Sequence, residues 1–364
     1  MRIVLTGGGT GGHLYPAVSV AQALWEIEPS VELLFVGSSH GPEGAVAAEA
    51  GIPFQAVPSS PLTRQISARN AVSMVRLLLG VFRARRILRK FGPNVVLGTG
   101  GYTTAAVLVA QKTLGGRIVI HEQNVVPGRT NRHLARIADR VCVSFETSAG
   151  WFPVGKVVVT GLPVRKEFSS LPDKKDARRA LGLRDDLFTL LVVGGSQGAR
   201  RLNELIMEAW PLMDDGSTQV LHQVGPRNVD QITSCSADGA AGLRYCAEAY
   251  VNMPVAMAAA DLVIGRSGAS TVAEITACGL PSILVPYPHA VADEQTANAR
   301  YLADRGAALV FRERTLTPDT LAGAVIGLKA SPDKLAAMSE SSRSLGVPDA
   351  ALRVAQVVLD VIGQ

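Results

Sequence analysis

The sequence predicts an α/β protein made of two doubly wound, Rossmann-like domains, and three observations lead to that prediction. Short apolar segments of strand length alternate with helical patterns along most of the 364 residues. Such alternation is typical of parallel sheets covered by helices on both faces. A second series of the same kind starts near residue 188, and its opening at 190–199 repeats the strand and glycine loop of the N-terminus. The chain is also long enough for two domains, each with its own core.

Strands in the first half are expected at 3–5, 31–36, 53–57, 94–98, 117–121 and 140–143, and helices at about 14–26, 42–50, 68–90, 102–114 and 127–138. In the second half we expect strands at 188–193, 218–223, 262–265, 281–285 and 308–311, with helices between them. Proline and charge interrupt the pattern between Gly161 and Pro172, which predicts a linker and a cleft between domains. The expected division is an N-terminal domain over 1–162, a C-terminal domain over 163–340 and a helical segment over 341–364. One arrangement for the segment 341–364 is that it packs back on the N-terminal domain.

Composition narrows the class of protein. A hydrophobic content of 47% is usual for a globular α/β fold. Four widely spaced cysteines without metal-ligand spacing indicate reduced thiols in the cytosol. No apolar run reaches the ~18 residues of a membrane span, and no signal segment precedes the first strand. We therefore expect a protein that is neither exported nor membrane-spanning.

The net charge of +5 is unevenly distributed. Residues 50–121 contain ten Lys or Arg and no Asp or Glu, so the rest of the chain carries −5. This segregation predicts one basic face, whose partner could be nucleic acid, anionic lipid or a phosphorylated substrate.

The segment Arg64–Lys90 carries most of this basic charge on a helical pattern, interleaved with apolar residues. A core-facing helix with a solvated basic side is one interpretation. The lack of Glu partners for i,i+4 pairing, together with arginines beside apolar residues, favours a membrane interface. Nucleic acid is less favoured because aromatic residues for base stacking are scarce here.

The segment Thr6–His13 contains five glycines in six positions, between the apolar run Ile3–Leu5 and a helical pattern. It predicts a strand, a glycine loop and a helix whose free N–H groups attract an anion or a sugar. A dinucleotide site also needs an acidic residue at the end of the second strand, which here reads Phe35–Ser38. A P-loop needs Lys and then Ser or Thr where His13 and Leu14 stand. From this stretch alone, a non-dinucleotide ligand site and a structural turn both remain open.

A second glycine loop, Gly98–Tyr102, follows another strand of the same sheet. We therefore expect two glycine loops at one edge, at the carboxyl ends of the strands. The strand at 117–121 leads into His121-Glu122-Gln123-Asn124, four consecutive side chains that can form hydrogen bonds. Such strand ends collect binding residues in open α/β sheets.

In the second half, the strand at 262–265 runs into Arg266-Ser267-Gly268-Ala269 and a helix. We expect Arg266 and the free N–H groups to neutralise a diphosphate, and Glu274 to accept hydrogen bonds from ribose hydroxyls. A Ser-capped helix with a surface Glu is the alternative. Polar residues from Asp293 to Asn298 open a later helix and suit a hydroxyl-rich ligand such as a sugar.

Together these motifs resemble the MurG family of N-acetylglucosaminyltransferases of peptidoglycan synthesis. The matching segments are Gly7–His13, Gly98–Tyr102, His121–Asn124, Gly194–Ala199 and Arg266–Glu274, with Gln295 and Asn298. They stand in the family's order and span nearly the whole chain. The resemblance implies the two-domain GT-B architecture with an interdomain cleft. It also implies inverting transfer of N-acetylglucosamine from UDP-GlcNAc to the 4-hydroxyl of the MurNAc-pentapeptide of lipid I, which forms lipid II.

The resemblance further implies that Glu274 holds the ribose, that Arg165 and Ser196 approach the diphosphate, and that Gln295 and Asn124 hold the sugar. The residues expected to bind UDP-GlcNAc are Thr10, Gly11, Gly12, His13, Asn124, Arg165, Ser196, Gln197, Arg266, Ser267, Gly268, Ala269, Glu274 and Gln295. Gly100, Gly101 and Tyr102 are expected to bind the acceptor. Two departures stand out: Glu294 occupies a position that often holds His or Gln, so its sugar contact does not carry over, and Gly161-Leu162-Pro163 replaces the common Gly-Asn-Pro.

The expected location is peripheral, on the cytoplasmic face of the cell membrane. Membrane contact is assigned to Leu78, Leu79, Phe82, Arg76, Arg83, Arg85, Arg86 and Lys90. The expected partners are lipid I and an anionic membrane surface, with cell-wall synthesis proteins as further candidates and no nucleic acid. No D-x-D metal motif occurs and no tightly bound cofactor is expected, which leaves Arg side chains and helix N-termini to stabilise the departing diphosphate.

The acceptor hydroxyl must lose a proton as it attacks the anomeric carbon. His13 is the expected general base, since histidine ordinarily titrates near neutral pH. Glu122 is the alternative base, and a purely orienting role for His13 also stays open. Two other functions fit the same residues: a UDP-GlcNAc 2-epimerase and a non-catalytic nucleotide-sugar sensor. Membrane binding through residues 64–90 would favour the lipid acceptor over both.

Overall fold

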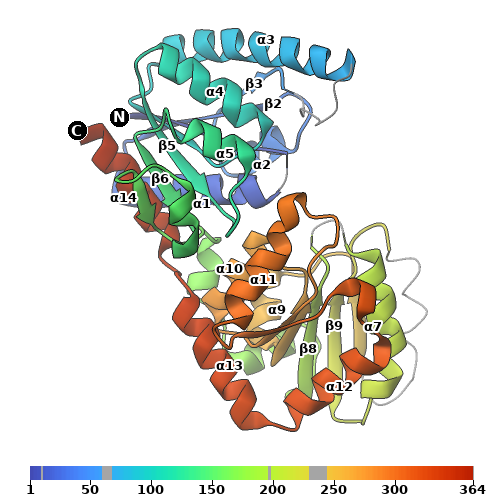
Figure 1. The fold of residues 1–364 in the computed structure, drawn as a ribbon. Helices are drawn as coiled ribbons and strands as arrows, with labels where there is room; N and C mark the ends of the chain where they lie inside the picture. Colours follow the sequence, from blue (N-terminus) through green and yellow to red (C-terminus); the bar gives the residue numbers. More distant parts are fainter. Residues whose placement is uncertain (10, 60–67, 196–197, 229–243, 364) are drawn as a thin grey trace. The chain divides into compact units, whose positions relative to one another are not determined.

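The structure is a computed structural model that describes residues 1–9, 11–59, 68–195, 198–228 and 244–363, without the side chains of 68–72. It divides into two compact units, Met1–Arg165 with Pro348–Gln364, and Lys166–Val347. Each unit contains one parallel sheet with helices against it (Figure 1). The predicted α/β class with two doubly wound domains is thereby confirmed.

The sheet of the first unit follows the order β3-β2-β1-β4-β5-β6-β7, and all neighbours are parallel. Its strands are β1 (Arg2–Thr6), β2 (Glu32–Ser38), β3 (Phe54–Val57), β4 (Val95–Gly98), β5 (Arg117–Glu122), β6 (Arg140–Val143) and β7 (Val157–Val159). The winding reverses between β1 and β4, where Thr6 lies beside Gly98. Ligands of open α/β sheets bind at such a switch point, outside the carboxyl ends of the strands. Both predicted glycine loops begin there.

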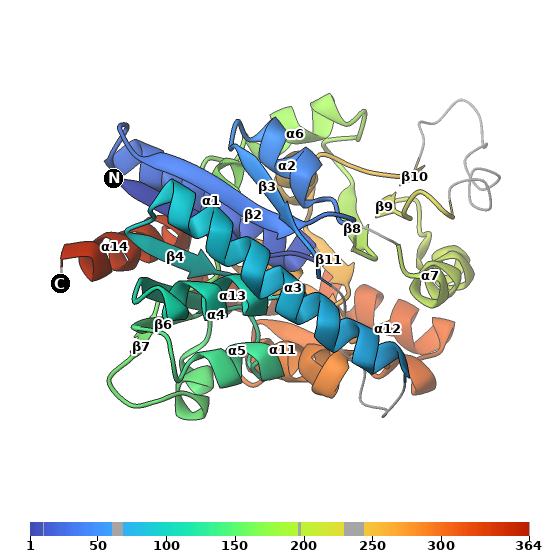
Figure 2. The ribbon, with the colours of Figure 1, turned by 90° about the horizontal axis from the view of Figure 1, so that it is seen from above.

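Helices cover both faces of this sheet. They are α1 (Gly11–Ile27), α2 (Glu43–Glu49), α3 (Ala68–Phe91), α4 (Tyr102–Thr113), α5 (Arg129–Leu134) and α14 (Ala350–Gly363), with the 3-10 helix η1 (Glu146–Trp151). Because side chains alternate along a strand, Ile3 and Leu5 pack with α1 and α14, whereas Val4 packs with α3 and α4. Figures 1 and 2 show α3 running over α4 on the second of these faces.

The sheet of the second unit follows the order β10-β9-β8-β11-β12-β13 and is also parallel. Its strands are β8 (Phe188–Val193), β9 (Thr218–Gln223), β10 (Tyr245–Glu248), β11 (Leu262–Gly265), β12 (Ser282–Leu284) and β13 (Ala308–Val310). Its helices are α6 (Lys174–Ala180), α7 (Arg200–Met213), α9 (Met253–Ala259), α10 (Ala269–Cys278), α11 (Glu294–Ala303), α12 (Pro318–Lys329) and α13 (Pro332–Leu345), and its 3-10 turns are η2 (Lys166–Ser169), η4 (Val291–Asp293) and η5 (Glu313–Thr315). The strands β7 and β10 were not predicted.

The last helix, α14, belongs to the first unit although it follows the second in sequence. Val354, Ala355 and Val358 form a buried stripe that packs with α1. The boundaries of the compact units, after Arg165 and after Val347, differ from the expected ones after residues 162 and 340. The second expected boundary falls inside α13, which stays with the second unit because it packs on α10.

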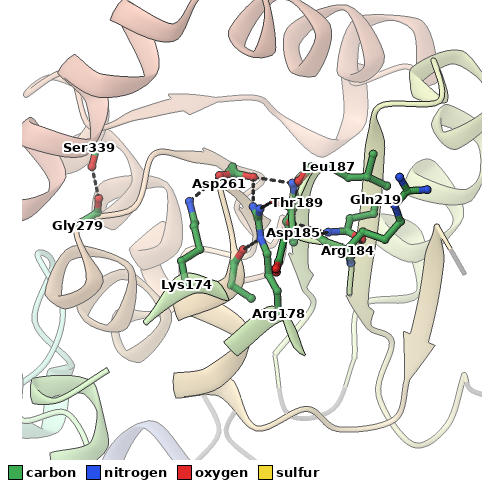
Figure 3. Close-up of polar contacts among 11 residues, drawn as sticks. Lys174, Arg178, Arg184, Asp185, Leu187, Thr189, Gln219, Asp261, Gly279 and Ser339 are labelled. Carbon is green, nitrogen blue, oxygen red and sulfur yellow. Dashed lines mark hydrogen bonds and ion pairs between the residues drawn. The ribbon is translucent and has the colours of Figure 1, made fainter. Parts of the chain in front are cut away.

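An ion-pair network attaches α6 to the amino ends of β8 and β11 (Figure 3). The Asp261 carboxylate accepts hydrogen bonds from Lys174 Nζ, Arg178 Nη2 and the Thr189 N–H, each at 2.6 Å. The buried Arg178 also donates to the Ala259 carbonyl at 3.1 Å. The Arg178 guanidinium and the Asp261 carboxylate therefore both have hydrogen-bond partners besides each other. A cavity of about 390 Å³ beside Lys174 and Asp261 lies at these amino ends, opposite the edge where open α/β sheets bind ligands.

Candidate functional site

The two glycine loops of the first unit pack directly against each other. The Gly8 N–H donates to the Gly100 carbonyl at 3.3 Å, and the Thr99 N–H donates to the Thr6 carbonyl at 2.9 Å. Gly101 has a φ of 90°, and a Cβ there would lie 2.3 Å from the Gly8 carbonyl oxygen. Only glycine fits such a position. The prediction that both loops lie at one edge of the sheet is confirmed.

The helix that follows the second loop begins without a side-chain cap. Half-buried Gly11 and Gly12 start α1, and Tyr102 starts α4 after the N-cap Gly101. The Tyr102 side chain is exposed, and its ring lies 4.0 Å from the Cβ position of Gly9. An aromatic ring therefore stands beside the first loop. Thr10, which was also predicted to bind the donor, lies outside the described residues.

His13, in the first turn of α1, is held by the second glycine loop. Its Nδ1 lies 3.0 Å from the Thr99 carbonyl oxygen and 3.2 Å from Gln123 Oε1. The Thr99 hydroxyl in turn donates to the His13 carbonyl at 2.6 Å. The ring is partly buried, and within the described residues its Nε2 has no hydrogen-bond partner. Among the residues that the structure describes, His13 is thus anchored through Nδ1.

Behind His13 lies a second imidazole, His121 at the end of β5, which is completely buried. Its Nε2 donates to the Gly161 carbonyl at 2.9 Å, and its Nδ1 lies 3.2 Å from Gln123 Nε2. Burial lowers the pKa of His121 to about 4, although the Gly161 hydrogen bond opposes that shift. His121 is therefore neutral at physiological pH.

Glu122, the alternative base, is also buried, and its carboxylate is fully engaged. It accepts hydrogen bonds from the Asn124 N–H at 2.9 Å, the Gly128 N–H at 3.1 Å and Asn131 Nδ2 at 2.9 Å. These bonds fold residues 123–128 back over the strand end. In this structure the Glu122 oxygens are turned inward and support a loop, and the alternative that Glu122 is the base stays a prediction. The half-buried Asn124 lies on that loop.

In the second unit, Arg266 follows β11 but turns its guanidinium inward. The side chain is buried, forms an ion pair with Glu313 and donates to the Val285 carbonyl at 3.1 Å and the Pro286 carbonyl at 3.4 Å. It also lies over the Tyr287 ring. In this structure Glu313 pairs with Arg266, and the expectation that Arg266 neutralises a diphosphate stays a prediction.

The turn after Arg266 is tied to α11. The Ser267 hydroxyl donates to the Gln295 carbonyl at 2.8 Å, and Asn298 Nδ2 donates to the Ser267 carbonyl at 3.2 Å. Gln295 Oε1 accepts from the Tyr287 N–H at 3.0 Å, which turns the amide nitrogen of Gln295 away from that bond. These contacts hold the residues that follow β11 and β12 beside the start of α11, where Gln295, one of the predicted donor-binding residues, stands.

The start of α10 is open. Its N-cap Gly268 makes no side-chain cap, and a Cβ there would meet nothing within 4 Å. The Ser270 hydroxyl in the first turn is shielded from solvent and has no partner among the described residues. Nearby, Ala292 and Asp293 both have φ near 55° (55° and 56°), an unusual pair of left-handed residues before α11. Uncapped N–H groups with an unsatisfied hydroxyl form a seat for an anion.

The other predicted donor residues are distributed over both units. Glu274 is half-buried on α10 near Cys278, whose pKa rises to about 12 mainly through burial and secondly through the Glu274 charge. Arg165 is half-buried at the end of the first unit's main segment. Ala269 begins α10 and Glu294 begins α11. Ser196 and Gln197 lie outside the described residues.

Helix α3 exposes a continuous apolar stripe. Met74, Val75, Leu78, Leu79 and Phe82 are all exposed, Phe82 to 70%, and their spacing places them on one helical face. Arg76, Arg86, Arg89 and Lys90 are exposed on the same helix. Arg83 and Arg85 are partly used within the fold, since Arg83 Nε donates to the Ala56 carbonyl at 2.9 Å and Arg85 Nη1 to the Thr113 carbonyl at 3.1 Å.

Sequence reasoning assigned no role to four residues that shape these sites, namely Thr99, Gln123, Ser270 and Glu43, whose carboxylate accepts a hydrogen bond from the Gly9 N–H of the first glycine loop at 3.0 Å. Gln123 and Ser270 stand inside motifs that were recognised, but their contacts depend on residues far away in sequence. Glu43 had no signal, since a glutamate at a helix start normally faces solvent. Within the described residues, no three His, Cys, Asp or Glu side chains gather as metal ligands. The same part of the chain contains no helix long and apolar enough to cross a membrane.

Comparison with known proteins connects both units to one family. The glycosyltransferase family 28 N-terminal domain matches residues 3–143, and the C-terminal domain of that family matches residues 189–354. The chain is 42% identical to the UDP-N-acetylglucosamine–N-acetylmuramyl-(pentapeptide) pyrophosphoryl-undecaprenol N-acetylglucosamine transferase of Desulforudis audaxviator, over 100% of this chain and 98% of that protein.

Solved structures show the same relation. The crystal structure of Acinetobacter baumannii MurG matches with a TM-score of 0.79 and 30% identity, over 99% of each chain. A UDP-GlcNAc 2-epimerase from Neisseria meningitidis, solved with UDP-GlcNAc bound, matches with a TM-score of 0.70 but only 14% identity, over 99% of this chain and 100% of that one. At that identity the second similarity shows the fold alone.

Proposed function

This chain belongs to glycosyltransferase family 28, among its UDP-N-acetylglucosamine–N-acetylmuramyl-(pentapeptide) pyrophosphoryl-undecaprenol N-acetylglucosamine transferases, and from this premise we propose which of its residues carry out the transfer. The reaction moves N-acetylglucosamine from UDP-GlcNAc to the MurNAc-pentapeptide of lipid I and forms lipid II for peptidoglycan. The epimerase alternative has only the fold in its favour, and membership of a transferase family does not support a non-catalytic sensor.

His13 is the proposed general base of the first unit. The observation that carries this assignment is that His13 Nδ1 faces two acceptors, the Thr99 carbonyl and Gln123 Oε1. A neutral ring must then carry its hydrogen on Nδ1 and keep a lone pair on Nε2. That lone pair would take the proton of the acceptor hydroxyl as the hydroxyl attacks the anomeric carbon. The proposed step breaks the bond to UDP on the other side of that carbon.

The start of α10 is the proposed seat of the donor's diphosphate. Its support is the uncapped first turn and the unsatisfied Ser270 hydroxyl, which can donate to a phosphate oxygen. Glu274, farther along the same helix, would accept hydrogen bonds from the ribose, and the amide nitrogen of Gln295 would donate to the sugar. Arg165 and Arg266 are the proposed cations for the diphosphate, and Arg266 is paired with Glu313 in this structure. The proposed mechanism uses no tightly bound cofactor.

The exposed stripe of α3 is proposed as the surface that meets the membrane, on the cytoplasmic face where UDP-GlcNAc is available. Five exposed apolar side chains on one face are costly in water and are suited to the acyl chains at a bilayer interface. The exposed Arg76, Arg86, Arg89 and Lys90 would meet anionic headgroups. Lipid I, which is anchored in that membrane, would then reach the first unit.

The base assignment is tested by the His13→Ala variant. Radiolabelled UDP-GlcNAc is incubated with a lipid I analogue, and the labelled lipid II is quantified after separation. General-base catalysis contributes about 10²–10⁴-fold, so kcat should fall within that range while donor affinity changes little. His133→Ala is the matched control, since that histidine lies exposed on α5 of the same unit. A His13→Ala enzyme with kcat within a few-fold of the control would refute the assignment.

A further inference from the structure

We propose that Gln123 is a positioning residue that fixes the tautomer of His13, and that the buried His121 fixes the orientation of Gln123. The two histidines would then carry their hydrogens on opposite ring nitrogens. The proposal rests on the proposed role of His13 as general base. It explains how the fold holds the His13 ring in the tautomer that can accept a proton on Nε2. The contacts that carry it form a series, which begins in the interior with the Gly161 carbonyl and ends at the His13 ring.

The tautomer of His121 follows from its partner. A backbone carbonyl can only accept, so the contact of 2.9 Å to the Gly161 oxygen requires a hydrogen on Nε2 of His121. The ring is completely buried, and its burial keeps it neutral. Nδ1 of His121 therefore carries no hydrogen and accepts one.

The orientation of the Gln123 amide follows next. Its Nε2 lies 2.6 Å from the Thr99 carbonyl oxygen, 3.2 Å from Nδ1 of His121 and 3.1 Å from the His121 carbonyl oxygen. All three partners are acceptors. Exchanging the amide oxygen and nitrogen would place two acceptors 2.6 Å apart, which is repulsive. The amide nitrogen must face His121, and the amide oxygen must face His13.

The consequence reaches His13 through that oxygen. Gln123 Oε1 and the Thr99 carbonyl both face Nδ1 of His13, at 3.2 and 3.0 Å, so Nδ1 carries the hydrogen. An unconstrained neutral imidazole populates both tautomers, and only one of them has its basic lone pair on Nε2. The Thr99 carbonyl and the Gln123 oxygen, whose orientation His121 fixes, together remove that ambiguity before the acceptor binds. Loss of Gln123 would leave Thr99 alone to orient the ring.

Nitrogen chemical shifts test the tautomers directly. Protein labelled with ¹⁵N-histidine is examined at pH 7.5 by two-bond ¹H–¹⁵N spectra, and signals are assigned with single His variants. His13 should appear with its hydrogen on Nδ1 and His121 with its hydrogen on Nε2. His222 is an internal reference for the second pattern, because its Nε2 faces Asn203 Oδ1 at 3.1 Å and its Nδ1 faces the Tyr245 hydroxyl at 2.7 Å. A wild-type His13 with its hydrogen on Nε2 would overturn the proposal without any variant of Gln123.

The positioning role is tested by Gln123→Met, which keeps the volume but removes both hydrogen-bonding groups. We expect a mixture of His13 tautomers and a kcat about tenfold lower, with KM for UDP-GlcNAc within about twofold. Gln111→Met is the matched control, since Gln111 is buried on α4 of the same unit and its side chain, within the described residues, donates to the Arg117 carbonyl. Equal spectra and equal kcat in the two variants would overturn the role of Gln123. If His13→Ala retained its kcat while the tautomers were as described, the base assignment itself would fail.

Discussion

The Glu43 carboxylate accepts a hydrogen bond from the Gly9 N–H at 3.0 Å, which ties the start of α2 to the first glycine loop. Glu43 is completely buried, and its Oε2 has no partner among the described residues. A Cβ at Gly8 would lie 1.9 Å from this carboxylate, and one at Gly41 would lie 1.7 Å from it. Gly8 and Gly41 are thus needed because a side chain at either position would collide with the Glu43 carboxylate. One carboxylate shapes the loop that leads to His13.

The first prediction concerns this carboxylate. Glu43→Ala should destabilise the protein by about 1.5–3 kcal/mol, the range for a hydrogen bond to a charged group, and should lower kcat by releasing the loop. Glu43→Gln should cost less, because an amide oxygen can still accept from Gly9. Urea denaturation and the transfer assay measure the two effects. Glu49→Ala, at an exposed position of the same helix, should stay within about 0.5 kcal/mol of wild type. Equal losses at both positions would refute the anchoring role.

The second prediction concerns the donor. Glu274→Ala would leave the ribose hydroxyls without their acceptor, which should cost about 1–3 kcal/mol, or roughly ten- to a hundred-fold in affinity for UDP-GlcNAc. Calorimetric titration with UDP-GlcNAc gives the Kd. Glu208→Ala on α7 is a suitable control because Glu208 is exposed. Unchanged binding by Glu274→Ala would remove the ribose assignment.

The third prediction concerns the membrane face of α3. Co-sedimentation with vesicles should require anionic lipid and weaken as salt rises. Reversing two exposed charges, Arg86→Glu with Lys90→Glu, should reduce binding by about tenfold or more, since each basic residue near the surface contributes about 1 kcal/mol. The same charge change at the exposed Lys175 and Lys334 of the second unit provides the control.

A neutral variant separates the apolar part of this surface from its charge. Phe82→Ser removes the most exposed aromatic ring of the stripe and leaves the charge unchanged. It should weaken binding to anionic vesicles at every salt concentration, because inserted apolar area is screened by no ion. If neither the charge reversal nor Phe82→Ser altered vesicle binding, the membrane contact would lie elsewhere in the protein.

The fourth prediction concerns the stability of the second unit in acid. Burial lowers the pKa of His222 to about 3, and the neutral ring bonds to Asn203 and Tyr245. Between about pH 6.5 and 3, His222 is protonated in the unfolded chain but stays neutral in the folded chain. The free energy of unfolding therefore falls as pH falls through this window. From pH 6.5 to 5 the loss from this group should be about 1–2 kcal/mol.

Urea denaturation at both pH values measures that loss. His222→Gln removes the titrating group and should flatten the dependence, although its stability at pH 7 will be lower. His289→Gln, at an exposed position of the same unit, should retain the wild-type dependence. An unaltered slope in His222→Gln would show that other groups cause the loss. His121, with a pKa of about 4, should add a loss of the same sign in the first unit.

Residue types and spacing were sufficient to predict the alternating strands and helices, the two glycine loops at one sheet edge, and the basic, apolar helix α3. These features are encoded locally. Hydrophobic runs of strand length, glycines at positive φ and helical spacing are set by neighbours in sequence. The unusual composition of residues 50–121 likewise needs no folded structure to be seen. His13 and Gln123 stood in motifs that the sequence singled out.

Only the tertiary structure decided what each polar side chain does. Glu122 and His13 both looked able to take a proton, but three donors surround the carboxylate while one nitrogen of His13 has no partner among the described residues. Arg266 was predicted from its local motif as a diphosphate ligand, and only the folded chain shows its ion pair with Glu313, 47 residues away. The contact of Gln123 with His13 spans 110 residues. Burial and pairing of this kind arise from the packing of distant segments, so local sequence carries no record of them.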